Sequence, residues 1–292
     1  MKIQNECVPC LIKRIVFEAE NSTKDKAVIQ KTIKKTLQAM AELYSPDAVS
    51  AELATKIHRI VYDSLGDEDP YKDLKAQSNK IAKTLVPRIN KLVSISDDPL
   101  RMSMLCSIVG NMMDFGIRGG SADPKNLKEI FEELVSKDLG HDDSEDFKRI
   151  LSKSKNIILF TDNCGEIVFD KILCREIKRF NPDIFLTLVV KGEKILSDAT
   201  LDDAKELGMD EVVDEILTTG CFAVGVDFKR LPDDVEKRLN ASDLIICKGM
   251  ANYESFSETE YKPIVYLMRT KCNAIAKSMG LPINVNAIKY YD

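Results

Sequence analysis

The spacing of apolar residues changes about halfway along the chain. Up to about residue 150, apolar positions recur three and four residues apart, which is the period of amphipathic helices. From residue 155 onward, short apolar runs typical of buried strands alternate with amphipathic stretches. We therefore predict two domains, a helical N-terminal part over residues 1–150 and an α/β part over residues 151–292.

The elements of the two parts can be placed from the same pattern. Helices are predicted over 24–44, 50–64, 74–92, 100–113 and 125–137. Strands of the second part are predicted over 156–161, 183–190, 211–217, 242–247, 264–268 and 282–286. Their alternation with helices predicts an α/β fold with a mostly parallel sheet flanked by helices. Because ligands of such sheets bind beyond the carboxyl ends of the strands, candidate chemistry is sought there.

Oxygen-bearing side chains follow the first two predicted strands of the α/β part. Asp162 and Asn163 stand between the first strand and a helical stretch, and Asp198 follows the second strand. Carboxylate and amide oxygens suit Mg²⁺, Mn²⁺ or Ca²⁺ better than Zn²⁺, and a helix N-terminus favours an anion such as phosphate. The alternative is that these residues only cap helices. Asp162 or Asn163 would cap the first helix, and Asp198 or Thr200 would cap the helix over 201–208, which is the favoured interpretation for Asp198 taken alone.

A lysine and several polar residues follow the fourth predicted strand. Lys248 precedes a glycine, where a ligand can approach the backbone closely, so its ammonium group is a candidate phosphate ligand. Asn252 and Glu254 could orient a substrate or a water molecule; the alternative is a solvated lysine at a turn. In the helical part, Asn111 and Asp114 lie at the end of an apolar helix and either organise the loop or reach the site. We favour a structural role for Asp114 and leave that of Asn111 open.

Two of the eight cysteines, Cys7 and Cys10, have the spacing of half a zinc site or of a redox pair. No second Cys-x-x-Cys accompanies them, and neither of the two histidines, His58 and His141, stands in a ligand pattern. Packing or local structure is therefore the simpler interpretation of this pair. A non-enzymatic metal or redox binding module built on Cys7 and Cys10 remains an alternative function.

Composition and charge exclude several classes of function. Hydrophobic residues make up 44% of the 292 residues and charged residues 30%, and no apolar run approaches the roughly 20 residues that span a bilayer. The N-terminus lacks the apolar stretch of a secretory signal, so we expect a cytoplasmic protein without a membrane partner. The net charge of −5, with basic residues scattered among acidic ones, excludes a nucleic-acid footprint. Glycine-rich nucleotide-binding loops and a Gly-x-Ser-x-Gly elbow are missing.

Five segments, in order over nearly the whole chain, resemble the metal-dependent damage-control phosphatases, a family formerly described as a domain of unknown function. They are Glu6–Cys10, Gly110–Gly116, Asp162–Glu166, Ser197–Asp203 and Lys248–Glu254. The Cys-x-x-Cys of the first segment points to the stand-alone subgroup found in archaea and some other microbes. The resemblance implies a helical part packed on an α/β sheet, with a divalent metal ion at the rim of the sheet.

The resemblance also implies roles for individual residues. Asp162, Asn163 and Asp198 match the family's metal ligands, and the ion would be Mg²⁺, Mn²⁺, Co²⁺ or Ni²⁺. Lys248 matches the position expected to bind the substrate phosphate. One departure is Ser197, where many relatives have Asn before the metal-binding Asp. The substrate-binding candidates are thus Lys248, Asn252 and Asn111.

The implied activity is hydrolysis of phosphate monoesters of sugars or of related damaged or surplus metabolites, so the expected partner is a small phosphorylated metabolite. A metal-activated water would attack the phosphorus, and Glu166 or Glu254 would orient this water or act as a base. Together with Asp162, these two are the catalytic candidates. The alternative enzyme is an S-adenosylmethionine-dependent carboxyl methyltransferase, as suggested for relatives, although no glycine-rich cofactor loop follows the first strand of the α/β part.

Overall fold

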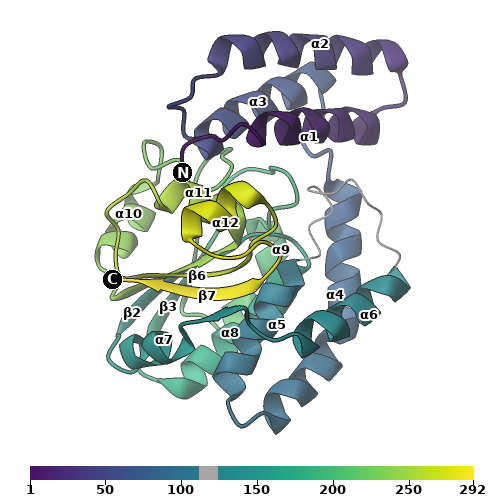
Figure 1. Cartoon of the computed structure of the whole chain (residues 1–292). Coiled ribbons are helices and arrows are strands. Elements are labelled where there is room, and N and C mark those ends of the chain that lie inside the picture. The colour runs from purple at the N-terminus through teal and green to yellow at the C-terminus, as the bar shows by residue number, and fades with distance from the viewer. Residues whose placement is uncertain (112–123) are drawn as a thin grey trace.

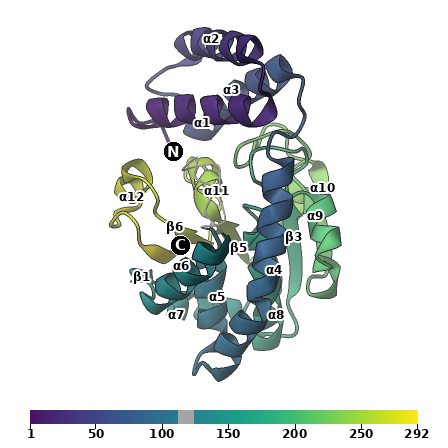
Figure 2. The ribbon, with the colours of Figure 1, turned by 90° about the vertical axis from the view of Figure 1, so that its right-hand side faces the viewer.

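The structure of the chain is a computed structural model that describes residues 1–111 and 124–292 (Figure 1). The chain begins with three helices that pack against one another in a layer above the rest of the molecule: α1 (Cys7–Ser22), α2 (Lys26–Leu43) and α3 (Ser50–Leu65). Their apolar stripes meet in one core around Ile57 and Val61. Figure 2 shows this α1–α3 layer lying over α11 (Gly249–Phe256) and the upper end of α4 (Lys72–Ile95).

The helix α5 (Pro99–Gly110) connects the helical segments to the α/β part. It begins at the N-cap Asp98, whose carboxylate accepts a hydrogen bond from the amide of Arg101, and Pro99 follows at a position where its missing N–H is not needed. α5 packs against both α4 and α8 (Glu166–Phe180). Two further helices, α6 (Pro124–Ser136) and α7 (Ser144–Leu151), follow α5 along the chain.

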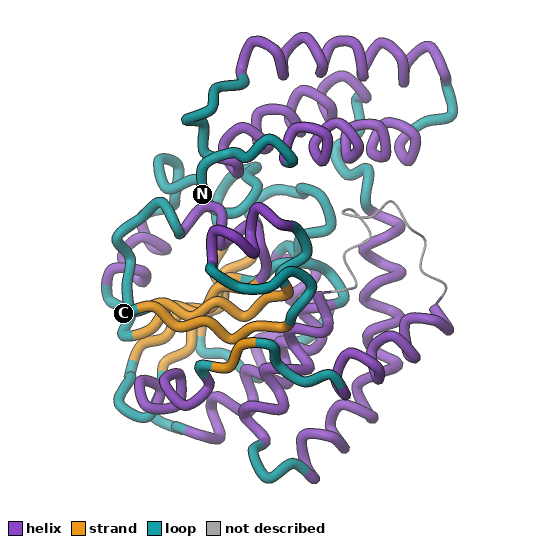
Figure 3. Tube along the Cα trace, in the orientation of Figure 1, coloured by secondary structure: helices purple, strands orange, loops and turns teal. Residues whose placement is uncertain are grey.

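Seven strands within the described residues form one sheet in the order β1-β7-β6-β5-β2-β3-β4. Figure 3 shows the strands side by side in orange, with helices around them. All neighbouring pairs are parallel except β6 and β7, which are antiparallel. The predicted α/β fold with a mostly parallel sheet is therefore confirmed. The strands are β1 (His141–Asp142), β2 (Asn156–Phe160), β3 (Phe185–Val190), β4 (Glu215–Thr218), β5 (Leu244–Lys248), β6 (Ile264–Arg269) and β7 (Asn286–Tyr291).

Helices cover both faces of the sheet. Alternate residues of β2 show this: Ile157 and Leu159 belong to the core under α5 and α8, whereas Ile158 and Phe160 belong to the core on the opposite face. Strands buried on both faces are apolar throughout, which explains the continuous runs in the sequence. The remaining elements are α9 (Leu201–Glu206), the 3₁₀ turn η2 (Met209–Glu211), α10 (Asp233–Asn240) and α12 (Asn273–Met279). None of the described helices is both long and apolar enough to cross a lipid bilayer.

Two predicted strands are wrong in their boundaries. The last strand is β7 rather than residues 282–286, because Pro282 has no N–H to donate and Asn284 has a left-handed backbone with φ of 62°. The strand predicted over 211–217 begins later, at β4, since its first residue still belongs to η2.

The sheet also extends into the segment predicted as helical. β1 precedes residue 150 and pairs in parallel with β7 at the edge of the sheet. Phe147 and Leu151 of α7 belong to the same core as β2. The first 150 residues therefore contribute an edge strand and core residues to the α/β layer, while the division into two domains stays a prediction.

Candidate active site

Two strand-end loops meet at the carboxyl edge of the sheet. β2 leads through Asp162 and Asn163 into α8, and the loop after β3 brings Asp198 to the same place. Asn163 and Asp198 form an isolated backbone bridge, and the amide of Ala199 donates to the carbonyl oxygen of Asp162 at 2.8 Å. The structure therefore brings the three predicted metal ligands together.

The cap positions of the helices that follow belong to other residues. Gly165 is the N-cap of α8, and its amide donates to Oδ1 of Asn79 at 2.6 Å. Thr200 is the N-cap of α9 and forms a capping box with Asp203. Capping of the second helix by Thr200, one of the two residues predicted for it, is therefore confirmed, whereas Asp162, Asn163 and Asp198 are not the N-caps.

Hydrogen bonds orient the side chains of this cluster. Oδ2 of Asp162 accepts from Nδ2 of Asn111 at 2.7 Å and from Nδ2 of Asn163 at 2.8 Å. Oδ1 of Asn163 accepts from the hydroxyl of Ser197 at 2.6 Å. Ser197, the departure from the family pattern, thus holds the amide of a predicted metal ligand.

A cavity of about 370 Å³ opens onto this cluster, which is within the size range of small-molecule sites. Five of the predicted site residues line it: Asn111, Asp162, Asn163, Asp198 and Glu254. The α1–α3 layer supplies part of the remaining lining, including Cys7, Cys10, Arg14 and His58. The cavity therefore lies between this layer and the carboxyl edge of the sheet.

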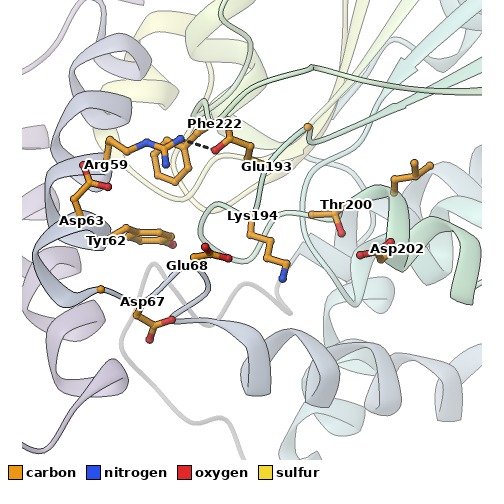
Figure 4. Close-up of a pocket in the computed structure, with 13 residues that line it drawn as sticks. Arg59, Tyr62, Asp63, Asp67, Glu68, Glu193, Lys194, Thr200, Asp202 and Phe222 are labelled. Atoms are coloured by element: carbon orange, nitrogen blue, oxygen red, sulfur yellow. Dashed lines mark hydrogen bonds and ion pairs between the residues drawn. The ribbon is translucent and has the colours of Figure 1, made fainter.

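A second cavity, of about 610 Å³, lies between α3 and the segment from β3 to α9 (Figure 4). Its lining is rich in acidic side chains, and one of them, Glu193, pairs with Arg59 at 2.6 Å. None of the predicted site residues is among its described lining. We therefore place the candidate active site at the smaller cavity.

Lys248 lies in a buried network behind this cavity. Its Nζ donates to Oε1 of Glu166 at 2.5 Å, to Oδ1 of Asp170 at 2.8 Å and to the hydroxyl of Ser107 at 2.6 Å. Lys248, Glu166 and Asp170 are all fully buried. The predicted role of Lys248 as a phosphate ligand finds no support in this arrangement, because its ammonium group is surrounded by protein and does not line the cavity.

The pKa values of Asp170 and Lys248 are both raised in this network, although burial and charge oppose each other at each group. Burial raises the pKa of Asp170 to about 6, although Lys248 opposes this shift. Burial alone would lower the pKa of Lys248, but the carboxylates of Asp170 and Glu166 outweigh it and raise this pKa above its ordinary value. Lys248 therefore stays an ammonium ion throughout the physiological range.

Asn111 connects the buried network with the cavity. Its Nδ2 donates both to Oδ2 of Asp162 and, at 2.5 Å, to Oε2 of Glu166. The preceding Gly110 allows this approach, because a Cβ there would stand 2.4 Å from the ring of Phe169 on α8. Asn111 thus reaches the site, while Asp114 lies outside the described residues.

The other two predicted residues of the Lys248 segment occupy different surroundings. Asn252 is buried and donates to the carbonyl oxygens of Thr161 at 2.9 Å and Lys248 at 2.7 Å, so it ties β5 to the end of β2. Glu254 lines the cavity, and burial raises the pKa of its carboxyl group despite a hydrogen bond to Ser50. Of the two predicted general bases, Glu166 and Glu254, only Glu254 borders the cavity.

Two residues of the site region were missed by the sequence analysis. Lys191 is buried directly after β3, and its Nζ lies 3.3 Å from Oδ2 of Asp198. Its position at a strand end is the same signal that pointed to Lys248, so it could have been found. His58 lines the cavity from α3, and no pattern in the sequence places this face of the helix toward the sheet.

The buried charges of this region fit a divalent cation. Within the part of the chain that the structure describes, no three His, Cys, Asp or Glu side chains stand ready to hold one ion. The candidate donors instead combine two carboxylates with the amide oxygen of Asn163, and oxygen donors are those that Mg²⁺ and Mn²⁺ prefer. Among the described residues, Asp162 and Asp198 are both buried beside this amide, where a divalent ion would stabilise their carboxylates.

Comparison with known proteins identifies similar chains over the full length. A family model described as the damage-control phosphatase ARMT1-like domain matches residues 3–284. A protein of Archaeoglobus fulgidus named damage-control phosphatase is 40% identical over 283 residues, which cover 97% of either chain. An uncharacterized protein of Methanocaldococcus jannaschii is 35% identical over 99% of this chain and 95% of its own length.

A protein of Pyrococcus horikoshii provides the structural comparison. It is named damage-control phosphatase and is 29% identical over 97% of this chain and 96% of its own length. The crystal structure of the same protein, described as a DUF89 family protein, superimposes with a TM-score of 0.91 at 27% identity and covers all of either chain. The described fold is therefore that of a solved relative.

Proposed function

The chain belongs to the damage-control phosphatase ARMT1-like family, and on this premise we propose that it is a divalent-metal-dependent phosphatase that hydrolyses phosphate monoesters of sugars or related metabolites. The observation that carries the proposal is the backbone pairing of Asn163 with Asp198 beside Asp162, which gathers three oxygen-bearing side chains on one wall of a cavity. The fold and the family support a phosphatase. Beyond the phosphatase activity, we propose that the reaction requires a divalent metal ion and that the substrates are phosphate monoesters of sugars or related metabolites.

Asp162, Asn163 and Asp198 would hold the ion through their side-chain oxygens. A bound divalent ion would polarise a phosphoryl oxygen and lower the pKa of a water molecule. In the chain itself, Asn111 and Ser197 fix the orientation of two of these side chains by hydrogen bonds. Preorganised ligands of this kind need little rearrangement when substrate binds.

We assign Glu254 the role of the general base that accepts a proton from the attacking water. It borders the cavity, and its raised pKa makes its carboxylate a better base than an ordinary one. Both carboxylate oxygens of Glu166 are bonded within the protein, to Lys248 and to Asn111. Glu166 and Lys248 therefore act, in this proposal, as positioning residues that hold Asn111 against Asp162.

Phosphate release from a panel of sugar phosphates tests the proposal directly. The protein is stripped with a chelator and assayed with Mg²⁺, Mn²⁺, Co²⁺ or Ni²⁺ in parallel. We expect release that requires metal and falls by about 100-fold or more in Asp162→Asn and Asp198→Asn. The matched control is Asp202→Asn, an exposed carboxylate four residues after Asp198 that lines the other cavity. Metal-independent release, or equal activity in all three variants, would contradict the proposal.

A further inference from the structure

The cavity contains a histidine whose second ring nitrogen has no protein partner. His58 on α3 is fully buried, and its Nδ1 lies 2.9 Å from the carboxylate of Glu18 on α1. Nε2 of the same ring has no hydrogen-bond partner among the described residues. His58 lines the cavity, so a bound molecule that reaches its ring can satisfy this buried polar nitrogen.

Glu18 determines which ring nitrogen of His58 is left without a protein partner. A carboxylate only accepts hydrogen bonds, so Nδ1 of His58 carries the proton that it donates to Glu18. Glu18 is itself fully buried and also accepts from the hydroxyl of Tyr71 at 3.2 Å. Held by α1 and by Tyr71, the carboxylate fixes the orientation of the ring, as carboxylates behind functional histidines generally do.

The position of His58 separates it from the predicted metal ligands. No group of three His, Cys, Asp or Glu side chains in the described ranges could hold one ion, so His58 does not complete a site with Asp162 and Asp198. Those carboxylates come from the sheet edge, whereas His58 comes from the α1–α3 layer on the other side of the same cavity. A phosphate ester bound by its phosphate at the sheet edge therefore extends its organic part toward this layer.

We propose that the Glu18–His58 pair is a substrate-positioning site, in which Nε2 of His58 forms a hydrogen bond with an oxygen of the organic part of the phosphate ester. The inference rests on the proposed function for the place of the phosphate. A hydroxyl or carbonyl oxygen of a sugar phosphate has the chemistry to pair with an imidazole nitrogen. His58 thereby selects among esters and leaves the reaction at phosphorus to the sheet edge.

Kinetics of His58→Leu and Glu18→Gln test this role. We expect KM for the preferred sugar phosphate to rise by about tenfold in His58→Leu, the size of one lost hydrogen bond, with a smaller change in kcat. Inhibition by inorganic phosphate and the affinity for Mn²⁺ should stay unchanged, because neither involves the organic part. Glu18→Gln should give a smaller rise, since its amide oxygen still accepts from Nδ1. The matched control is His141→Gln, which replaces the other histidine, on β1 and outside this cavity.

A wild-type measurement keeps the inference independent of whether the variants fold. The chain has two histidines, so ¹⁵N-histidine NMR contains one set of ring signals for each, and His141→Gln assigns them. A sugar phosphate should shift the Nε2 signal of His58 and leave His141 unchanged, whereas inorganic phosphate alone should move neither. Turnover without any shift at His58, or an unchanged KM in His58→Leu, overturns the inference and leaves the proposed function standing. A shift without metal-dependent turnover would overturn the proposed function and retain the binding site. The absence of both the shift and the turnover would overturn both proposals.

Discussion

Gly249, the first residue of α11, lies so close to Asp162 that a Cβ there would stand 1.8 Å from Oδ2 of this carboxylate. Its backbone φ of 73° is in the left-handed region, which residues with a side chain rarely adopt. Both observations require glycine at the end of β5. The carboxylate of Asp162, a candidate metal ligand, is therefore packed directly against the turn after Lys248.

Replacing Gly249 by alanine should reduce activity far more than stability. The added Cβ must displace the carboxylate of Asp162, and we expect phosphate release to fall by about 100-fold, the effect of misplacing a catalytic group. The matched control is Gly280→Ala, whose φ is 67° and whose Cβ would meet nothing within 4 Å. Backbone strain should cost each variant about 1 kcal/mol of unfolding free energy, and Gly249→Ala should lose about 1–3 kcal/mol more because its Cβ overlaps Asp162. Equal activity of the two variants would contradict this assignment.

Metal ions should stabilise the folded protein. Asp162 and Asp198 are buried carboxylates, and an ion that binds only the folded state adds about 2.7 kcal/mol at 100 times its Kd. Thermal unfolding with Mn²⁺ and with a chelator measures the effect. Asp202→Asn should keep the increase in Tm, while Asp198→Asn should lose it. The same increase in Asp198→Asn would place the ion elsewhere.

The metal-ligand candidates could be predicted because they follow strands in the sequence. Strands buried on both faces are continuous apolar runs, so their carboxyl ends can be found, and the next polar residues must lie at one edge of the sheet. Asp162 is such a residue, whereas Asp198 lies eight residues after β3 and is a predicted ligand through the family resemblance; the structure places the two together. Lys191 has the same position after β3 and was overlooked.

The remaining features depend on tertiary packing that the local pattern does not contain. His58 belongs to an ordinary amphipathic helix, and only the packing of α3 over the sheet edge brings it into the cavity. The burial of Lys248 depends on α5 and α8, whose residues Ser107 and Asp170 surround its ammonium group. The boundary of β7 was misplaced because the left-handed Asn284 interrupts an otherwise strand-like run.

Removing the charge of Lys248 should strongly destabilise the fold. Lys248→Met leaves Glu166 and Asp170 buried without their cation, and breaking a buried ion pair in this way costs about 3–5 kcal/mol of unfolding free energy. The matched control is Lys83→Met, because Lys83 pairs with Glu206 on the surface and such pairs contribute about 0–1 kcal/mol. Urea unfolding compares the two. Adding Asp170→Asn to Lys248→Met should recover part of the loss, and strictly additive effects would show that the two residues are not coupled.

The raised pKa of Asp170 should make stability fall as the pH rises. The folded protein holds this proton up to about pH 6, above the ordinary range of an aspartate, so the stabilising contribution is complete at low pH and is lost as the pH passes 6. In Asp170→Asn the side chain stays neutral at every pH. The unfolding free energy of the wild type relative to this variant should therefore decrease between about pH 4 and pH 7. If the difference in unfolding free energy between the wild type and Asp170→Asn stays constant or increases with pH, the raised pKa of Asp170 is contradicted.

The cysteines of the cavity should be dispensable for metal-dependent turnover. Cys7 and Cys10 lie in the first turn of α1, and Cys272 lines the same cavity. Burial raises the pKa of Cys7, and it raises that of Cys272 to about 11, so in the absence of a bound metal these two thiols stay protonated and are poor nucleophiles. We expect Cys7→Ser/Cys10→Ser to retain its activity with Mn²⁺ within about twofold, whereas Asp162→Asn loses it. Elemental analysis of both proteins completes the test: loss of all bound metal in the cysteine variant would instead favour a metal-binding module built on Cys7 and Cys10.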